Sequence, residues 1–262
     1  MAAIEKPRLA VIKLASCDGC QLQLLNLEDE LLEIACAVEI SYFPEASSAL
    51  LEGPYDVALV EGSVTTEHDL ERLRDIRKQA QMLIALGACA NAGGIQSLRN
   101  MQDIGEYTRA IYAKPSYIHT LAQSTPLAAH VAIDFAINGC PISREQLLEV
   151  ITAVLLGRTP KLPTHSVCVE CKRNGNVCVL VAHGIACLGP MTAAGCGALC
   201  PGFRRGCFGC YGPMESASPD VLCHELIARG VPRDEMIRLL SGYTSWAVEF
   251  RAAAEKLEKV AL

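Results

Sequence analysis

The residues best suited to chemistry in this chain are its cysteines, fourteen among 262 residues. Twelve of them fall into two sets. The first set is scattered through the N-terminal part of the chain: Cys17, Cys20, Cys89 and Cys140. The second is concentrated toward the C-terminus: Cys168, Cys171, Cys178, Cys187, Cys196, Cys200, Cys207 and Cys210. Because a cubane iron-sulfur cluster takes four thiolates, these twelve cysteines would serve three clusters, which indicates electron transfer.

Zinc binding and thiol chemistry are the alternatives. Cys17 and Cys20 have the C-x2-C spacing that zinc sites, redox dithiols and clusters share, but a dithiol would leave Cys89 and Cys140 unexplained. Two zinc sites could use the eight C-terminal cysteines, although two C-x2-C pairs about 15 to 20 residues apart are not found. Cys140 and Cys200 each precede proline, as in bacterial ferredoxin runs, but the ferredoxin spacing is absent. Composition alone therefore leaves zinc open.

Charge and hydropathy exclude several other classes of function. The net charge is -6, the isoelectric point is near 5.6 and there is no basic stripe, so we expect no nucleic-acid partner. The N-terminal residues show no export signal, and no uninterrupted apolar run reaches the length of about 18 residues that indicates a membrane span. We therefore expect a cytoplasmic protein without a membrane span. In that compartment, many cysteines indicate metal binding or redox chemistry more than disulfides.

Short β-rich runs alternate with helical stretches up to about residue 157. Strands are expected at 8–15, 36–43, 56–62, 82–88 and 131–137, and helices at 21–34, 67–81 and 143–157. Ser143 and Gln146 have the spacing of a capping box, and Gly157 is expected to end the third helix. This alternation predicts an α/β fold with a doubly wound parallel sheet covered on both faces.

The first four cysteines follow the ends of predicted strands. Cys17 and Cys20 come after the first strand, Cys89 after the fourth and Cys140 after the fifth. Because the carboxyl ends of parallel strands meet at one edge of the sheet, these distant segments can converge there on one cofactor. Glycines within 87–94 would let the backbone approach that cofactor and donate N-H groups to its sulfurs.

The alternation of predicted strands and helices ends after Gly157. A proline-bearing linker leads into residues 165–213, which have almost no regular pattern and which bound metal would have to organise. Amphipathic helices are expected after that segment. We therefore expect two domains, 1–160 and 161–262. The two remaining cysteines, Cys36 at a predicted strand start and Cys223 in a predicted helix, are expected to be small core residues.

Six motifs carry a resemblance to a known family: SCDGCQ (16–21), VEGSV (60–64), GACANAGG (87–94), GCP (139–141), CLGPMTAAGC (187–196) and CPGFRRGCFGC (200–210). Together they resemble the small subunit of nickel-iron hydrogenases, and most closely the cytoplasmic, multi-subunit group linked to NAD(P), which includes the sulfhydrogenases. The resemblance implies a flavodoxin-like domain with a proximal cluster, followed by a cysteine-rich, largely irregular iron-sulfur domain with C-terminal helices.

The resemblance also implies how the cysteines divide among three 4Fe-4S clusters. The proximal cluster would be bound by Cys17, Cys20, Cys89 and Cys140. The medial cluster would be bound by Cys196, Cys200, Cys207 and Cys210. The distal cluster would be bound by Cys168, Cys171, Cys178 and Cys187. His165 lies three residues before Cys168 and is a fifth candidate ligand of the distal cluster. The favoured interpretation is that His165 lies near that cluster without binding its iron. Glu61 would lie near the proximal cluster, where it could order a loop or help move protons.

The same resemblance implies an oxidoreductase acting on hydrogen whose nickel-iron site lies in another chain. The expected partners are that large subunit together with flavin/NAD(P)-binding and ferredoxin-like subunits. No residue of this chain is expected to be catalytic. Two rival interpretations are a cluster subunit of the NADH-quinone-reductase type and a zinc-stabilised assembly module without redox function. The C-x2-C spacing and the eight-cysteine extension count against the first rival, whose paired ligands are adjacent cysteines.

Overall fold

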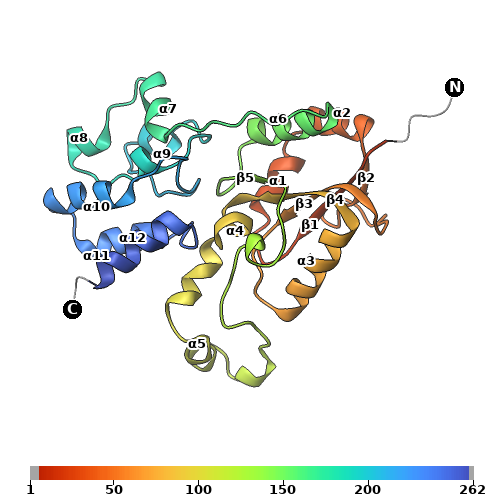
Figure 1. Ribbon diagram of the computed structural model, residues 1–262, viewed down its shortest axis with the longest axis horizontal. Coiled ribbons are helices and arrows are strands. Elements are labelled where there is room, and N and C mark those ends of the chain that lie inside the picture. Colours follow the sequence, from red (N-terminus) through yellow and green to blue (C-terminus); the bar gives the residue numbers. More distant parts are fainter. Residues whose placement is uncertain (1–5, 260–262) are drawn as a thin grey trace.

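A parallel sheet of five strands forms the first part of the structure, a computed structural model that describes residues 6–259 (Figure 1). The strands are β1 (Arg8–Lys13), β2 (Glu39–Tyr42), β3 (Tyr55–Glu61), β4 (Ala80–Leu86) and β5 (Phe135–Ile137). Their order across the sheet is β2-β1-β3-β4-β5, and every neighbouring pair is parallel. This is the flavodoxin-like order, so the predicted α/β fold class is confirmed.

Helices cover both faces of the sheet. On one face, α1 (Gly19–Leu25), α2 (Asp29–Ala37) and α6 (Arg144–Leu155) bury residues such as Leu24, Ile34 and Val150. On the other face, α3 (Glu67–Gln79) packs Leu73 and Ile76 against the strands. Figure 1 shows the first group above the sheet and α3 below it. The core of this domain is therefore two apolar layers that fix the strand ends from which the cysteine loops emerge.

One predicted helix was wrong, because the structure divides 21–34 into α1 and α2. Glu28 adopts a positive φ of 54° between them, and the fully buried Leu27 fills the core at this break. The prediction for Cys36 is also wrong. Cys36 lies exposed in the last turn of α2, and it does not start a strand in the core. Cys223 is buried in a C-terminal helix, as predicted.

The segment between β4 and β5 is longer and more irregular than the flanking units. It contains α4 (Gly87–Ala92), η1 (Ile95–Met101), α5 (Ile104–Ile111), η2 (Pro115–Tyr117) and η3 (Leu127–Ala129). The fifth strand is shorter than predicted, since β5 begins only at Phe135. Directly before β5, the carboxylate of Asp134 accepts a hydrogen bond from the N-H of Leu83 at 2.7 Å.

The C-terminal part contains short helices followed by longer ones. The cysteine-rich segment carries α7 (Val167–Arg173), α8 (Val179–His183), η4 (Gly189–Met191) and α9 (Leu199–Gly202). The last helices are α10 (Pro219–Ala228), α11 (Arg233–Leu240) and α12 (Val248–Lys259), which share an apolar core with Leu188 and Met191. The N-H of Trp246 donates to the carbonyl of Ala92 at 3.2 Å, joining this part to the sheet domain. Within residues 6–259, no helix has the length and apolar character needed to cross a membrane.

Candidate metal centres

The proximal set of cysteines converges at the carboxyl edge of the sheet. Cys17 follows β1, Cys20 lies in the first turn of α1, Cys89 lies in α4 and Cys140 follows β5. Burial is the main cause that raises the pKa of Cys20, and the charges of Cys89 and Cys140 raise it further. Cys17 and Cys140 act in the same way on Cys89. The four cysteines are therefore close enough to interact electrostatically, although they come from three distant segments.

The protonation of these thiols has a consequence for metal binding. Burial raises the pKa of Cys89 to about 11, and it also raises the pKa of Cys140. Without a cation such thiols keep their protons at neutral pH, whereas a coordinating thiol is deprotonated by the metal's charge. Filling this site therefore releases protons, and its occupation by a cationic group also relieves the repulsion among the thiolates.

Two glycines test whether the site fits a group held by sulfur with backbone packed against it. Gly87 has φ +79°, and a Cβ placed there would lie 2.4 Å from Sγ of Cys20. Gly94 has φ +63°, and its Cβ would lie 2.4 Å from Sγ of Cys89. The backbone thus approaches two sulfurs more closely than any side chain would allow. The close approach expected of the glycines in 87–94 is present, and the residues fit a cluster.

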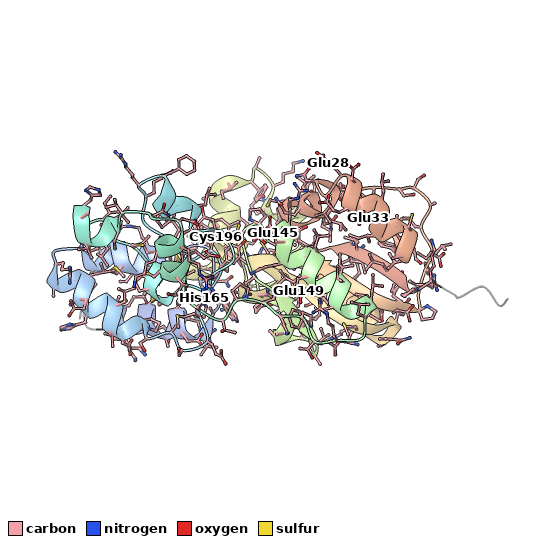
Figure 2. The ribbon with its side chains drawn as sticks, turned by 90° about the horizontal axis from the view of Figure 1, so that it is seen from above. Glu28, Glu33, Glu145, Glu149, His165 and Cys196 are labelled. Atoms are coloured by element: carbon pink, nitrogen blue, oxygen red, sulfur yellow. The ribbon has the colours of Figure 1, made fainter. Side chains whose placement is uncertain are left out.

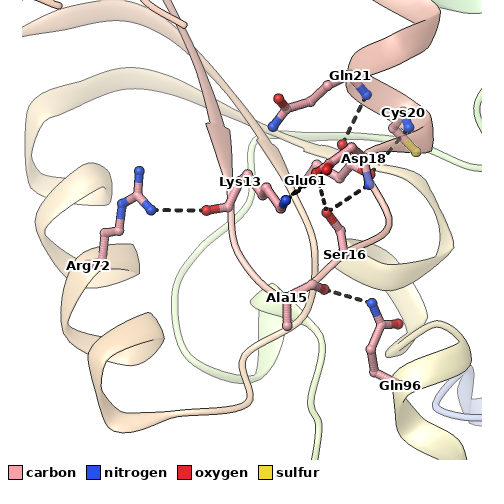
Figure 3. Close-up of polar contacts among 9 residues, drawn as sticks. All are labelled: Lys13, Ala15, Ser16, Asp18, Cys20, Gln21, Glu61, Arg72 and Gln96. Carbon is pink, nitrogen blue, oxygen red and sulfur yellow. Dashed lines mark hydrogen bonds and ion pairs between the residues drawn. The ribbon is translucent and has the colours of Figure 1, made fainter. Parts of the chain in front are cut away.

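Glu61, at the end of β3, holds the loop that carries the first two cysteines (Figure 3). Its side chain is 1% exposed and accepts hydrogen bonds from the N-H groups of Cys20 at 3.2 Å and Gln21 at 3.0 Å. Burial raises the pKa of this carboxyl, while the two backbone hydrogen bonds lower it. Glu61 therefore caps the first turn of α1 from a neighbouring strand, and the structure places it beside the proximal set.

Gln96 is a contact of the proximal set that the sequence did not predict. The thiol of Cys89 donates to Oε1 of Gln96 at 3.2 Å, and Nε2 of Gln96 donates to the carbonyl of Ala15 at 2.8 Å. This side chain therefore joins the loop after β1 to the segment after β4 (Figure 3). No sequence pattern identifies a contact between residues 81 positions apart.

The distal set lines a cavity of about 80 Å³ in the cysteine-rich segment. All four predicted distal cysteines line it: Cys168, Cys171, Cys178 and Cys187. A Cβ on Gly189 would lie 3.3 Å from Sγ of Cys187 and 3.7 Å from Sγ of Cys168, so the backbone again approaches sulfur closely. Cys187 is buried, whereas Cys178 is exposed. The distal set therefore reaches the protein surface at Cys178.

His165 does not line the distal cavity. Its Nδ1 lies 3.2 Å from the carbonyl oxygen of Ser166, and its own carbonyl accepts from the N-H of Ala194. Figure 2 shows His165 and Cys196 near the middle of the molecule. These contacts favour a structural role for His165 over binding of iron.

Replacing His165 with alanine is therefore expected to leave the proposed distal cluster in place. The backbone contact with Ala194 survives the change, and four cysteines remain at the cavity. Iron and sulfide content of the His165→Ala complex, together with its paramagnetic signals, should match the wild type. Loss of one cluster's iron would show that His165, and not one of the four cysteines, is a ligand.

The medial set lies between the other two. Burial raises the pKa of Cys210 to about 12, and the charges of Cys196 and Cys200 raise it further. Cys140, a proximal residue, also acts on the pKa of Cys210, and its neighbour Gly139 lines a small cavity together with Cys210. At the other side, the N-H of Cys207 donates to Sγ of the distal Cys187 at 3.2 Å. Contacts between neighbouring sets therefore run in the order proximal, medial, distal.

Glu170 is a second contact that the sequence did not predict. Its carboxylate accepts hydrogen bonds from the N-H groups of Gly195 at 2.9 Å and Ala198 at 3.1 Å. Ala198 has a positive φ of 54°, so this carboxylate holds a strained turn beside Cys196. The only available signal was an acidic residue placed between Cys168 and Cys171.

Over residues 6–259, no three His, Cys, Asp or Glu side chains are arranged to hold a lone metal ion.

Comparison with known proteins agrees with this architecture. The family model of the NADH ubiquinone oxidoreductase 20 Kd subunit matches residues 17–154. The sulfhydrogenase 2 subunit delta of Pyrococcus furiosus is 39% identical over 91% of this chain and 100% of its own. The vhu F420-non-reducing hydrogenase of Methanocaldococcus jannaschii has a subunit that is 35% identical over 80% of this chain and 83% of its own. A chain of the NAD+-reducing [NiFe]-hydrogenase structure superposes with a TM-score of 0.57 at 29% identity, covering 61% of this chain and 96% of that chain.

The fold and the cysteine sets define an iron-sulfur subunit built on the sheet domain of the 20 Kd family. The chain belongs to that family and, within it, to the small subunits of nickel-iron hydrogenases. The match to the 20 Kd model ends at residue 154, whereas the hydrogenase subunit from Pyrococcus furiosus also covers the cysteine-rich extension. The predicted hydrogenase family is therefore confirmed, and the relation to quinone reductases lies in the sheet domain.

Proposed function

We propose that this chain relays electrons between the nickel-iron site of a large subunit and a flavin/NAD(P) or other redox partner, in a cytoplasmic complex, through three 4Fe-4S clusters. The observation that carries the proposal is the serial contact among three sets of four cysteines. Gly139, which precedes Cys140, lines one cavity with Cys210 of the second set, and the N-H of Cys207 donates to Sγ of Cys187 between the last two sets. Neighbouring sets in direct contact suit one-electron transfer along a line.

The proposed ligands are the twelve cysteines, divided as the resemblance implies. The proximal ligands are Cys17, Cys20, Cys89 and Cys140. The medial ligands are Cys196, Cys200, Cys207 and Cys210. The distal ligands are Cys168, Cys171, Cys178 and Cys187. When bound, the clusters supply one-electron redox chemistry. The domains are proposed to be 1–160, with the proximal set, and 161–262, with the other two.

The protein's own residues would hold and tune these sites. Burial of Cys20 and Cys207 would keep water away from the clusters they bind. Backbone N-H groups that donate to sulfur, such as that of Gly209 to Cys207, would offset part of the negative charge on the thiolates. Glu61 would fix the first turn of α1 and so the position of Cys20. Splitting of hydrogen is assigned to the large subunit, and Glu61 has no step in it here.

Metal analysis tests the proposal directly. The native complex, purified without oxygen, is expected to contain about twelve iron and twelve acid-labile sulfide for this chain, after subtraction of the partners' content. Zinc without sulfide would instead support the zinc-stabilised module. About four iron and four sulfide would leave only one cluster here, which contradicts the three-cluster assignment and favours the quinone-reductase type.

A further inference from the structure

Tyr211 lies between the proximal and the medial sets, and its side chain has no role in the assignments above. It is buried, with only 4% of its surface exposed. A Cβ on Gly139 would lie 2.9 Å from Cζ of Tyr211, and a Cβ on Gly195 would lie 2.8 Å from Cε1 of the same ring. These two glycines directly precede the proximal Cys140 and the medial Cys196. The ring is therefore packed against the backbone of one loop from each set.

Gln146 reaches the same place from the first turn of α6. Its spacing from Ser143 predicts a capping box, but only half of that motif forms. Oγ of Ser143 accepts from the N-H of Gln146 at 3.1 Å, whereas the Gln146 side chain turns inward, with Nε2 at 3.5 Å from the carbonyl oxygen of Ala194. A Cβ on Gly195 would lie 2.2 Å from this Nε2. Figure 2 shows the start of α6, at Glu145, beside Cys196.

The amide of Gln146 is buried and incompletely paired. Gln146 is 8% exposed, and its Oε1 has no hydrogen-bond partner among the described residues 6–259. A buried polar atom without a partner costs free energy, so its retention indicates a role. Cε1 of Tyr211 is bonded to the carbon that carries the hydroxyl, so the hydroxyl and the amide are neighbours. Burial raises the pKa of Tyr211, and the charges of Cys196 and Cys210 raise it further, which places the hydroxyl beside the medial set.

We infer that Tyr211 and Gln146 form a polar pair that raises the reduction potential of the medial cluster. The inference rests on the proposed function, because it needs a cluster at the medial set. Reduction adds one electron, supplied from hydrogen by the large subunit, to a cluster that four thiolates already make anionic, and it breaks no bond. The hydroxyl of Tyr211 would donate to the unpartnered Oε1 of Gln146, and the amide N-H groups would then face the added negative charge. Such donors stabilise the reduced form, which raises the potential.

A purely structural role is the competing explanation. The ring of Tyr211 fills the space between two loops, and the amide of Gln146 lies against the carbonyl of Ala194. Both contacts would then serve only to shape the loops that carry the cysteines. The two explanations differ in the effect of losing the hydroxyl alone. Because phenylalanine keeps the ring and its packing, a structural role leaves every potential unchanged.

Potentiometric titration of the native complex, followed by paramagnetic resonance, separates these explanations. The test variants are Tyr211→Phe and Gln146→Met, which remove polar groups and keep the size of the side chain. The matched control is Tyr55→Phe. Tyr55 is 6% exposed and donates to the carbonyl of Leu51 at the start of β3, the opposite end of that strand from the cysteine sets. The medial signal is identified as the one that disappears in Cys196→Ser.

The distal signal serves as the internal reference, because neither Tyr211 nor Gln146 lines the distal cavity. In both test variants, the equilibrium constant for moving one electron from the distal to the medial cluster should fall about 10-fold. This corresponds to a medial potential lower by about 59 mV relative to the distal one. Iron and sulfide content should keep the wild-type values. The control should match the wild type in potentials and in iron.

Each remaining outcome decides the question. An unchanged or higher medial potential in Tyr211→Phe would overturn the inference, as would an equal shift in the control. Loss of medial iron in Tyr211→Phe would also overturn it, because the hydroxyl would then hold the site and not tune it. If only Gln146→Met lost iron, the potential of Tyr211→Phe would still decide. A wild-type complex with only about four iron in this chain would instead contradict the proposed function.

Discussion

Replacing Cys89 with serine is expected to abolish hydrogen-dependent reduction of the partner. Cys89 is a proposed proximal ligand, is only 9% exposed and comes from a strand end that no other proximal cysteine shares. A serine hydroxyl is a poor ligand for iron that prefers soft thiolates. Turnover should fall by more than about 100-fold, the upper end of the loss seen when a partner of a metal ligand is removed.

Metal content and spectroscopy check the cause of that loss. Iron assigned to this chain should fall from about twelve to about eight, and one paramagnetic signal should disappear while the medial and distal signals remain. Cys36→Ser is the matched control, because Cys36 is exposed on α2 and lies outside the three sets. The control should keep wild-type iron content and activity. Unchanged turnover in Cys89→Ser would remove Cys89 from the ligand set.

The placement of the proximal set could be predicted because it depends on strand ends alone. Hydrophobic runs identify β1, β4 and β5 in the sequence, and a parallel sheet brings their carboxyl ends to one edge. The position of each cysteine after its strand then follows, whichever residues occupy the intervening loops. The same regularity made the flavodoxin-like class predictable.

Features set by side-chain contacts between distant segments could not be predicted in this way. The break between α1 and α2 depends on burial of Leu27 and a positive φ at Glu28, and the leucine spacing gave no sign of either. For the same reason, the sequence left Cys36 on the wrong element. Gln96 and Glu170 were missed because they act on loops far along the chain, and polar residues of these types are common on any surface.

The spacing of the eight C-terminal cysteines in the sequence could not by itself predict how they divide into two sets. Cys187 contacts the medial Cys207, while it lines the distal cavity with Cys168. Residues 165–213 have no sheet to order them, so equal distances in sequence do not correspond to equal distances in space. Resemblance to hydrogenase small subunits supplied a division, and the cavity lined by four of the cysteines supports it.

Replacing Gly87 with alanine is expected to prevent filling of the proximal site. An added Cβ would lie 2.4 Å from Sγ of Cys20 and 3.1 Å from the carbonyl oxygen of Gly139, so both a proposed ligand and the loop before Cys140 must move. The positive φ of 79° adds backbone strain of about 1–2 kcal/mol for a residue with a side chain. We expect iron to fall by about four per chain, with loss of hydrogen-dependent turnover comparable to that of Cys89→Ser.

Gly157→Ala separates the contact with sulfur from the strain of the backbone. Gly157 also has a positive φ, 61°, but a Cβ there would have no atom within 4 Å. Both variants therefore carry the cost of a left-handed alanine, and only Gly87→Ala displaces a proposed ligand. Thermal unfolding should show a small loss of stability in both, whereas iron content and turnover should fall only in Gly87→Ala. Equal iron content in the two variants would mean that the close approach of Gly87 to Cys20 is not needed to hold a cluster, and the proximal assignment would lose its main geometric support.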